Sequence, residues 1–207
     1  MRVIAGTLRR RTLEAPAGLA TRPTSDRLRE TLFNVLAPRM EGAHFLDLYA
    51  GSGAVGIEAA SRGAASVVMV ERAEPALKVL HSNLDKLGLR GSVRVQAMGV
   101  ERFLRRLRPE MSPMRFDVVF LDPPYEAVEE YTLTLGLLGA IETGLLAPGA
   151  IVIAEHRRKE KLEERYGMLK RTRVLEQGDA ALSFYASPAS HLSMPSDPGT
   201  VVSGEEA

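Results

Sequence analysis

The stretch that decides the fold is HFLDLYAGSGAVG, residues 44–56. Its first five residues form a short apolar run typical of a buried strand, and glycines follow at positions 51, 53 and 56. A glycine-rich turn between a strand and a helix lets the main chain take positive φ angles and approach a ligand closely. The helix that follows offers free amide groups at its N-terminus. The stretch therefore predicts a strand–turn–helix unit with a ligand site at the turn.

Short apolar runs alternate with helical patterns on both sides of this unit, which is typical of βαβ connections and a sheet covered on both faces. The clearest helix has Pro75 in its first turn and Gly88 as its stop signal. We expect seven strands, at His44–Leu48, Ser66–Val70, Ser92–Gln96, Phe116–Leu121, Ala150–Ala154, Lys170–Leu175 and Ala181–Tyr185. The last two are close enough in sequence to form an antiparallel hairpin at a sheet edge. The expected fold is a doubly wound, Rossmann-like α/β domain with a seven-stranded mixed sheet.

Composition divides the 207 residues into three regions. Residues 1–40 form a basic extension, with β-like segments at Arg2–Ile4 and Arg11–Leu13 that predict a hairpin. A helix follows, which we expect Thr24 or Ser25 to cap and Pro38 to end. Residues 41–187 hold the α/β domain. Residues 188–207 are rich in Ser, Pro and Gly and lack apolar periodicity, so we expect a disordered tail.

Several classes of protein are excluded by composition. The chain has no cysteine and only four scattered histidines, which argues against disulfides and against a metal site. The uncharged, largely apolar stretch from Tyr131 to Ile141 is far shorter than the roughly 20 residues that span a bilayer. Three arginines at positions 9–11 interrupt any signal-peptide core. We expect a metal-free cytoplasmic protein without a membrane segment, and we expect it to be a monomer.

Charge is unevenly distributed behind the formal net value of +1. Residues 1–40 carry eight arginines against three carboxylates, so the extension is the basic end of the chain. A basic arm on a near-neutral body suggests a polyanionic partner, although on charge alone a solvated charged face is the favoured explanation. A second basic cluster, Arg157, Arg158, Lys159 and Lys161, alternates with glutamates. That pattern is more often a solvated helix face than a contact with RNA.

Two carboxylates near the glycine turn indicate the kind of ligand. Glu71 ends the second expected strand, 20 residues after Gly51, where a carboxylate can accept hydrogen bonds from ribose hydroxyls. Together with the glycines it indicates a nucleoside cofactor. Asp47 lies on the strand before the turn and would repel a pyrophosphate but face an ammonium-bearing ligand. Asp47 therefore favours S-adenosylmethionine over a dinucleotide.

A second motif, Asp122-Pro123-Pro124-Tyr125, directly follows the apolar strand at 116–121. Two successive prolines remove two backbone donors and leave carbonyl acceptors in a stiff turn. The Asp122 carboxylate and the Pro123 carbonyl can hold both N–H groups of an amino group on a nucleobase, which directs its lone pair at an electrophilic methyl. Tyr125 offers a face for base stacking. We call residues 122–125 the acceptor turn. Because ligands bind at the carboxyl ends of strands, the acceptor turn and the glycine turn should share one crevice.

Four segments together resemble the bacterial RsmD family of small-subunit rRNA methyltransferases: RVIAGTLRRRTL, RPTSDRLRETLFNVL, DLYAGSGAVGIEAASRGA and FLDPPY. The resemblance covers roughly residues 2–186. It implies a class I methyltransferase fold and transfer of a methyl group from S-adenosylmethionine to the 2-amino group of guanine 966 in 16S rRNA, with the 30S subunit as partner. The target base would have to leave its stack to be reached.

The resemblance also implies roles for individual residues. Asp122, Pro123, Pro124 and Tyr125 would hold the target base. The cofactor would be bound by Asp47, Tyr49, Ala50, Gly51, Ser52, Gly53, Glu71, Arg72, Met98 and Gly99. The RNA would be bound by Arg9, Arg10, Arg11, Arg22, Thr24 and Arg27. One departure concerns the adenine pocket, because residues 97–100 carry no side chain that accepts a hydrogen bond. We expect backbone groups and the apolar side chains of Met98 and Val100 to recognise the adenine.

Three rival functions stay open at this point. A DNA adenine N6-methyltransferase would use the same acceptor turn, but the chain lacks a sizeable target-recognition insertion. A dehydrogenase would need a substrate domain, for which 207 residues leave no room. A non-catalytic RNA-binding assembly factor would have no reason to keep Gly51, Asp122 and Tyr125.

Overall fold

The computed structural model describes residues 1–15, 25–107, 115–124, 126–140 and 144–187. Arg22, Thr24, Tyr125 and the tail at 188–207 lie outside the described residues. In the part of the chain that is described, none of the helices is long and apolar enough to cross a membrane.

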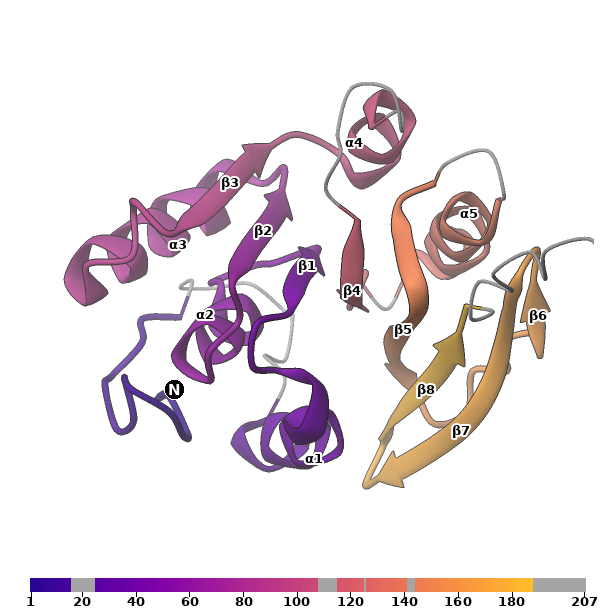
Figure 1. Ribbon diagram of the computed structural model, residues 1–207, viewed down its shortest axis with the longest axis horizontal. Coiled ribbons are helices and arrows are strands. Elements are labelled where there is room, and N and C mark those ends of the chain that lie inside the picture. The colour runs from indigo at the N-terminus through magenta and orange to yellow at the C-terminus, as the bar shows by residue number, and fades with distance from the viewer. Residues whose placement is uncertain (16–24, 108–114, 125, 141–143, 188–207) are drawn as a thin grey trace, which may run out of the picture.

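One mixed sheet of eight strands, in the order β3-β2-β1-β4-β5-β8-β7-β6, forms the centre of the described structure (Figure 1). The strands are β1 (His44–Leu48), β2 (Ser66–Glu71), β3 (Val93–Ala97), β4 (Phe116–Leu121), β5 (Leu146–Arg157), β6 (Arg165–Tyr166), β7 (Leu169–Gln177) and β8 (Ala180–Ala186). The first five strands in the sheet order are parallel, and β8, β7 and β6 continue it antiparallel. The strand order reverses at β1, which lies between β2 and β4, and crevices at such switch points bind ligands.

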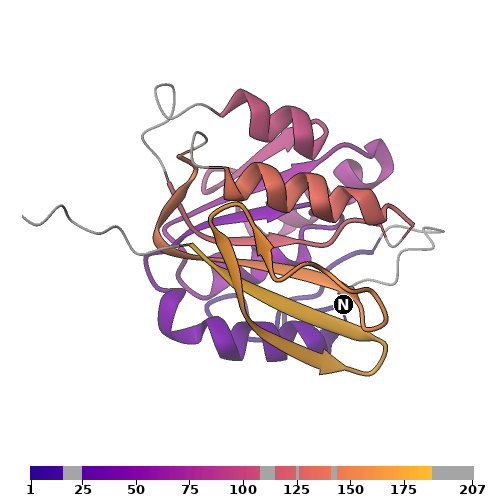
Figure 2. The same cartoon turned by 90° about the vertical axis from the view of Figure 1, so that its right-hand side faces the viewer.

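Helices cover both faces of the sheet. They are α1 (Asp26–Leu36), the short 3₁₀ helix η1 (Ala37–Arg39), α2 (Ala54–Ser61), α3 (Glu74–Leu87), α4 (Val100–Arg106) and α5 (Val128–Gly139). Successive residues of a strand point to opposite faces, so Phe45 packs in a core with α1, α2 and α3, and Leu46 packs in a second core with α4 and α5. This confirms the Rossmann-like α/β fold expected from the sequence. In Figure 2 the hairpin of β7 and β8 lies between α5 above and α1 below.

The N-terminal extension is fastened to α2 by polar contacts. Arg2 and Thr12 form an isolated antiparallel bridge, so the expected hairpin is present in minimal form. The buried Glu58 carboxylate of α2 accepts hydrogen bonds from the backbone N–H of Ile4 (2.7 Å) and of Ala5 (3.0 Å). Gly6 then passes so close to Ser61 that a Cβ atom there would lie 1.8 Å from the Ser61 carbonyl oxygen. The extension therefore cannot shift without breaking contacts made by a buried charge.

Two sequence predictions differ from the structure at the C-terminal edge. The sheet has eight strands rather than seven, because the two-residue strand β6 pairs with β7. The charged segment after Ala154 contains no helix. Instead β5 continues through Arg157, which pairs with Ala180, and the N–H of Arg158 donates to the Asp179 carbonyl (2.8 Å). Pairing with β8 therefore overrides the helix-like charge pattern.

Backbone meets backbone where α5 ends against the turn between β6 and β7. A Cβ atom on Gly139 would lie 1.9 Å from the Tyr166 carbonyl oxygen, and one on Gly167 would lie 2.3 Å from the Gly139 carbonyl oxygen. The N–H of Met168 donates to the same Gly139 carbonyl (2.8 Å). We call this contact the glycine seam. It fixes the end of α5 against the C-terminal hairpin.

Candidate active site

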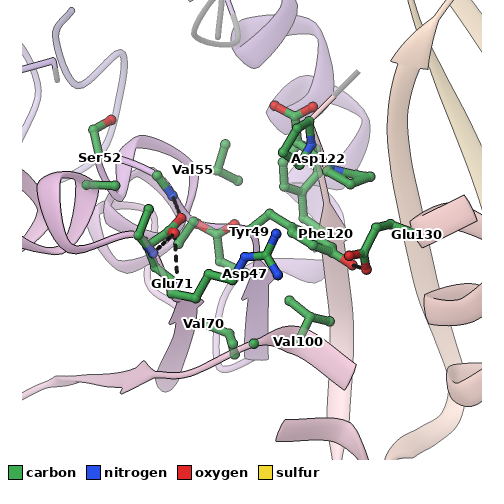
Figure 3. Close-up of a pocket in the computed structure, with 18 of the residues that line it drawn as sticks. Asp47, Tyr49, Ser52, Val55, Val70, Glu71, Val100, Phe120, Asp122 and Glu130 are labelled. Carbon is green, nitrogen blue, oxygen red and sulfur yellow. Dashed lines mark hydrogen bonds between the residues drawn. The ribbon is translucent and has the colours of Figure 1, made fainter. Parts of the chain in front are cut away.

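A cavity of about 530 Å³ opens at the carboxyl ends of the parallel strands (Figure 3). Its volume falls in the range of small-molecule sites, roughly 300–1,000 Å³. From the sequence-predicted set it is lined by Asp47, Tyr49, Ala50, Gly51, Ser52, Glu71, Arg72, Met98, Gly99, Asp122, Pro123 and Pro124. The glycine turn and the acceptor turn thus share one crevice, as their positions after parallel strands predict.

The glycine turn takes its shape from left-handed backbone conformations. Gly51 has φ +56° and Gly53 has φ +81°, and Tyr49 adopts φ +63°, which is uncommon for a residue with a side chain. A Cβ atom on Gly51 would meet nothing within 4 Å, so this residue leaves the backbone open. Gly53 is buried at the N-cap of α2, against Leu80 and Met69. It shapes the turn from behind and does not line the cavity.

Glu71 holds the turn to the end of β2. One carboxylate oxygen, Oε2, accepts the N–H of Gly51 (2.9 Å). The other, Oε1, accepts the N–H of Arg72 (2.8 Å) and of Ala73 (2.7 Å). Each carboxylate oxygen has two lone pairs, so this arrangement leaves acceptor capacity for a ligand hydroxyl.

Asp47 is a buried carboxylate at the floor of the cavity. Its Oδ2 accepts the N–H of Gly56 in the first turn of α2 (2.8 Å), which braces the glycine turn from below. Burial raises the pKa of Asp47 to about 7, the Gly56 hydrogen bond opposes this shift, and the negative charge of Glu71 adds to it. A bound cation would relieve the cost of ionising this group.

Tyr49 connects the glycine turn to α5. Its hydroxyl donates to Oε2 of Glu130 (2.8 Å) and shares a hydrogen bond with Thr134 (2.7 Å). Burial raises the pKa of Tyr49, so the hydroxyl stays protonated and remains a donor. Non-glycine residues with positive φ tend to cluster at functional sites, so the backbone conformation of Tyr49 indicates that the glycine turn has a functional role.

The acceptor turn begins beside Tyr49. In the sheet Leu48 pairs with Leu121, so Tyr49 and Asp122 follow two paired residues. Asp122 is half-buried, Pro123 is buried and Pro124 is exposed. The Pro124 carbonyl accepts the N–H of Ala127 (2.8 Å), which closes the turn ahead of α5. The position of the Tyr125 ring lies outside the described residues.

The corner of the cavity expected to hold the adenine is more polar than the sequence suggests. Met98, Gly99 and Val100 line the cavity, and so do Glu101 and Arg102 from the first turn of α4. The carboxylate of Glu101 accepts a hydrogen bond from Arg105 (2.9 Å). A carboxylate is therefore present near this corner, one residue beyond the stretch 97–100, whose side chains accept no hydrogen bond.

Other lining residues were not predicted from the sequence. Some directly adjoin predicted site residues, and others come from distant parts of the chain. The full set is Met1, Ala15, Ala54, Val55, Val70, Ala73, Ala76, Phe120 and Glu130. Phe120 had a signal, since it lies two residues before Asp122 and alternation puts both on one side of β4. No signal in the sequence identifies Glu130 as a lining residue, because only the fold brings the first turn of α5 to Tyr49.

The arginines predicted to bind RNA are not gathered around the cavity. Thr7 and Leu8 bond to Ser61, the last residue of α2, and Arg11 donates to the carbonyl of Lys86 in the last turn of α3. The cavity lies at the opposite, N-terminal ends of these helices. Since α3 has 14 residues, Arg9, Arg10 and Arg11 lie roughly 20 Å from the glycine turn. Arg27 is exposed in the first turn of α1.

Known proteins share both the sequence and the fold. The family model described as conserved hypothetical protein 95 matches residues 1–186. The putative rRNA methyltransferase YlbH of Bacillus subtilis (strain 168) is 38% identical over 185 residues, covering 89% of this chain and 98% of YlbH. Ribosomal RNA small subunit methyltransferase D of Escherichia coli (strain K12) is 40% identical over 157 residues, covering 75% and 74%.

A solved structure, the putative methyltransferase yhhF from Escherichia coli, superposes with a TM-score of 0.76 at 34% identity. The superposition covers 92% of this chain and 99% of yhhF. The family match spans far more than half of the sequence, and the cavity geometry agrees with it. The chain therefore belongs to the conserved hypothetical protein 95 family, the RsmD family of rRNA methyltransferases.

Proposed function

We propose that this protein transfers a methyl group from S-adenosylmethionine to the exocyclic 2-amino group of guanine 966 in the 16S rRNA of the small ribosomal subunit. The observation that carries the proposal is that the glycine turn and the acceptor turn line one cavity. The relatives named as small-subunit rRNA methyltransferases support the RNA substrate. Guanine, its 2-amino group and position 966 come from the family resemblance.

The residues present fit S-adenosylmethionine. Gly51 leaves room for a ligand against the backbone, and Glu71 retains acceptor capacity for ribose hydroxyls. Asp47 is a buried carboxylate whose ionisation a ligand ammonium group would favour. Val70, Met98 and Val100 add an apolar wall for the adenine. When bound, the cofactor supplies an electrophilic methyl group on a sulfonium centre.

The acceptor turn prepares the amino group for attack. An amino nitrogen on a purine ring is a weak nucleophile because its lone pair is delocalised into the ring. Asp122 and the Pro123 carbonyl accept its two N–H groups and so orient the lone pair toward the glycine turn. As the new N–C bond forms, the bond between the methyl carbon and the sulfonium sulfur would break and leave the neutral thioether S-adenosylhomocysteine. The methylated nitrogen would then carry the positive charge, and its extra proton would pass to Asp122 or to water. The protein contributes chiefly positioning and exclusion of water.

The basic extension is proposed to hold the RNA through Arg9, Arg10, Arg11, Arg22, Thr24 and Arg27. Arginine contacts to phosphates set the register of an RNA without reading its sequence, and RNA shape would select the site. A distance of roughly 20 Å between Arg9–Arg11 and the glycine turn suits a substrate as large as the small subunit.

The test measures transfer of tritium from labelled S-adenosylmethionine to 30S particles purified from a strain that lacks the family enzyme. We expect label in N2-methylguanosine after digestion, and a large loss of label with Asp122→Ala. Parallel reactions with naked 16S rRNA and with duplex DNA separate the substrates. Label in N6-methyl-2′-deoxyadenosine of DNA, or no label in any substrate, would overturn the proposal.

A further inference from the structure

Three basic residues follow the carboxyl end of β5: Arg157, Arg158 and Lys159, which we call the rim cluster. In the sheet Leu121 pairs with Ala154, so Arg157 lies three residues beyond the level at which β4 ends. At about 3.3 Å per residue this places it roughly 10 Å further along the strand direction, past the end of β4 where the acceptor turn begins. The rim cluster therefore stands on the same edge of the sheet as Asp122.

An ion pair joins the rim cluster to the residue that follows the acceptor turn. A guanidinium nitrogen of Arg157, Nη2, lies 3.8 Å from a carboxylate oxygen of Glu126, which follows the acceptor turn. Both side chains are substantially exposed, at 39% and 86%, and ion pairs between exposed side chains contribute little to stability. The pair with Glu126 is therefore weak enough to give way to a stronger anion.

The charge and exposure of this segment suit a phosphate partner. Residues 157–161 carry four cations and one carboxylate. Arg158 and Lys159 are exposed, and within the described residues neither forms an ion pair. The backbone is held by β5 and by the hydrogen bond from the Arg158 N–H to the Asp179 carbonyl, so the fold fixes the backbone positions from which these side chains project. Arginine binds phosphate through a rigid fork of donors.

The rim cluster differs in position from the basic residues of the extension. Arg9, Arg10 and Arg11 lie at the far ends of α2 and α3 from the cavity. An RNA bound only there would leave the target nucleotide unsupported at the acceptor turn. Removing a base from its stack costs free energy, and contacts beside the extruded nucleotide can offset that cost.

We infer that the rim cluster binds the phosphates of the RNA that flank the target nucleotide, on the side of the acceptor turn. This inference rests on the proposed function, because it assumes that an RNA nucleotide enters the cavity. It assigns the RNA two separate contact surfaces, a distant one on the extension and a near one at the cavity rim.

The experiment compares two triple variants of the full chain. The rim variant carries Arg157→Gln, Arg158→Gln and Lys159→Gln. The control variant carries Arg165→Gln, Lys170→Gln and Arg173→Gln, which removes the same charge from exposed positions on β6 and β7. Lys170 pairs with Ala186, which pairs with Ile151, so Lys170 lies six residues, or roughly 20 Å, from Arg157 along the sheet.

Two readouts are measured for each variant: kcat/KM for 30S particles, and filter binding of 16S rRNA, both over a range of KCl concentrations. We expect the rim variant to flatten the salt dependence of log kcat/KM by about one unit for each phosphate that the variant no longer binds, and to lower kcat/KM at least tenfold at physiological salt. The control variant should match the wild type. The affinity for S-adenosylmethionine, from calorimetry, should be equal in all three proteins.

A rim variant that matches the wild type, or a control variant that loses as much as the rim variant, would overturn the inference. Failure of the proposed function gives a different pattern, in which the wild type transfers no methyl group to any RNA. In that case filter binding still decides whether the rim cluster holds RNA. A triple variant of Arg9, Arg10 and Arg11 adds a comparison. It should weaken the binding of 16S rRNA in the filter assay and leave kcat close to that of the wild type.

Discussion

The two halves of the cavity are made rigid in different ways. On the side of the glycine turn, Asp47 and Glu71 accept four hydrogen bonds from backbone N–H groups: those of Gly51 and Gly56 hold the turn and the start of α2, and those of Arg72 and Ala73 hold the Glu71 carboxylate. On the acceptor side, two proline rings stiffen the turn covalently, and Pro124 is exposed. The difference matches the proposed ligands. A small cofactor can be enclosed by a prearranged pocket, whereas a nucleotide of a large RNA needs an acceptor that is stiff and also open.

The largest expected effect comes from the acceptor side. Asp122→Ala removes the carboxylate that accepts the amino N–H, and methyl transfer should fall by on the order of 1,000-fold, as when a preorganised polar group is lost from an active site. Cofactor affinity should stay nearly unchanged, which calorimetry can measure. Asp122→Asn keeps one acceptor and should retain partial activity. Near-normal turnover of the alanine variant would remove Asp122 from the mechanism.

The next effect concerns the pH dependence of stability on the cofactor side. Folding raises the pKa of Asp47 from 3.8 to about 7, so between these values the folded protein keeps a proton that the unfolded chain releases. The free energy of unfolding should therefore fall as pH rises from about 4 to about 7, by roughly 4 kcal/mol at most, and level off above that.

Asp47→Asn supplies the control, because an amide oxygen can still accept the Gly56 N–H but does not titrate in this range. Urea unfolding of the cofactor-free proteins at several pH values measures the difference. The wild type should lose stability relative to the variant as pH rises. A difference that is constant between pH 4.5 and 7.5 would show that Asp47 ionises normally.

A smaller effect is expected from Glu71→Gln. The amide group has to place its NH₂ against at least one of the three N–H donors that the carboxylate now accepts. Cofactor affinity should fall by about 10–100-fold, in line with the loss of one or two hydrogen bonds to a charged group. Calorimetry with S-adenosylmethionine and with S-adenosylhomocysteine checks this, and equal affinity for wild type and variant would contradict it.

The smallest effect tests the link between the two halves. Tyr49→Phe removes the hydroxyl that connects the glycine turn to Glu130 and Thr134. We expect kcat to fall about fivefold, equivalent to about 1 kcal/mol, with a smaller change in KM for the cofactor. Tyr185→Phe is a matched control, since its hydroxyl donates to the Glu163 carbonyl away from the cavity. An equal loss of kcat in both variants would show that losing a buried tyrosine hydroxyl anywhere in the fold lowers kcat, and would contradict a specific role for Tyr49.

Local signals in the sequence predicted much of the fold. Strands β1 and β4 have the predicted bounds, Ser25 caps α1 through the N–H of Leu28 (3.1 Å), and Gly88 ends α3 with φ +69°. Each depends on residues close together in the chain. The two turns of the cavity were also predicted, because strand direction alone places both at one edge.

Contacts between distant segments could not be predicted. Nothing in the sequence pairs Tyr49 with Glu130, or Glu58 with the backbone of Ile4, since 81 and 54 residues separate these partners. The charged segment that begins at Arg157 was wrongly assigned to a helix face, because alternating charges fit a strand end and an exposed turn as well as a helix. In the structure Arg157 pairs with Ala180 and the Arg158 N–H donates to the Asp179 carbonyl, so β5 extends to Arg157 and a turn follows it.

Helix α5 links the glycine seam to the cavity, so the position of the acceptor turn depends on a contact far from it. α5 starts just after the acceptor turn, carries Glu130, and ends at Gly139 after 12 residues, roughly 18 Å away. A methyl group at Gly139 or Gly167 would force the two backbones apart. Because α5 is a stiff helix, a displacement of its C-terminal end would also move its N-terminal end beside the acceptor turn. Alanine at either position should therefore misalign the acceptor turn, and a second change that restores the spacing should repair it.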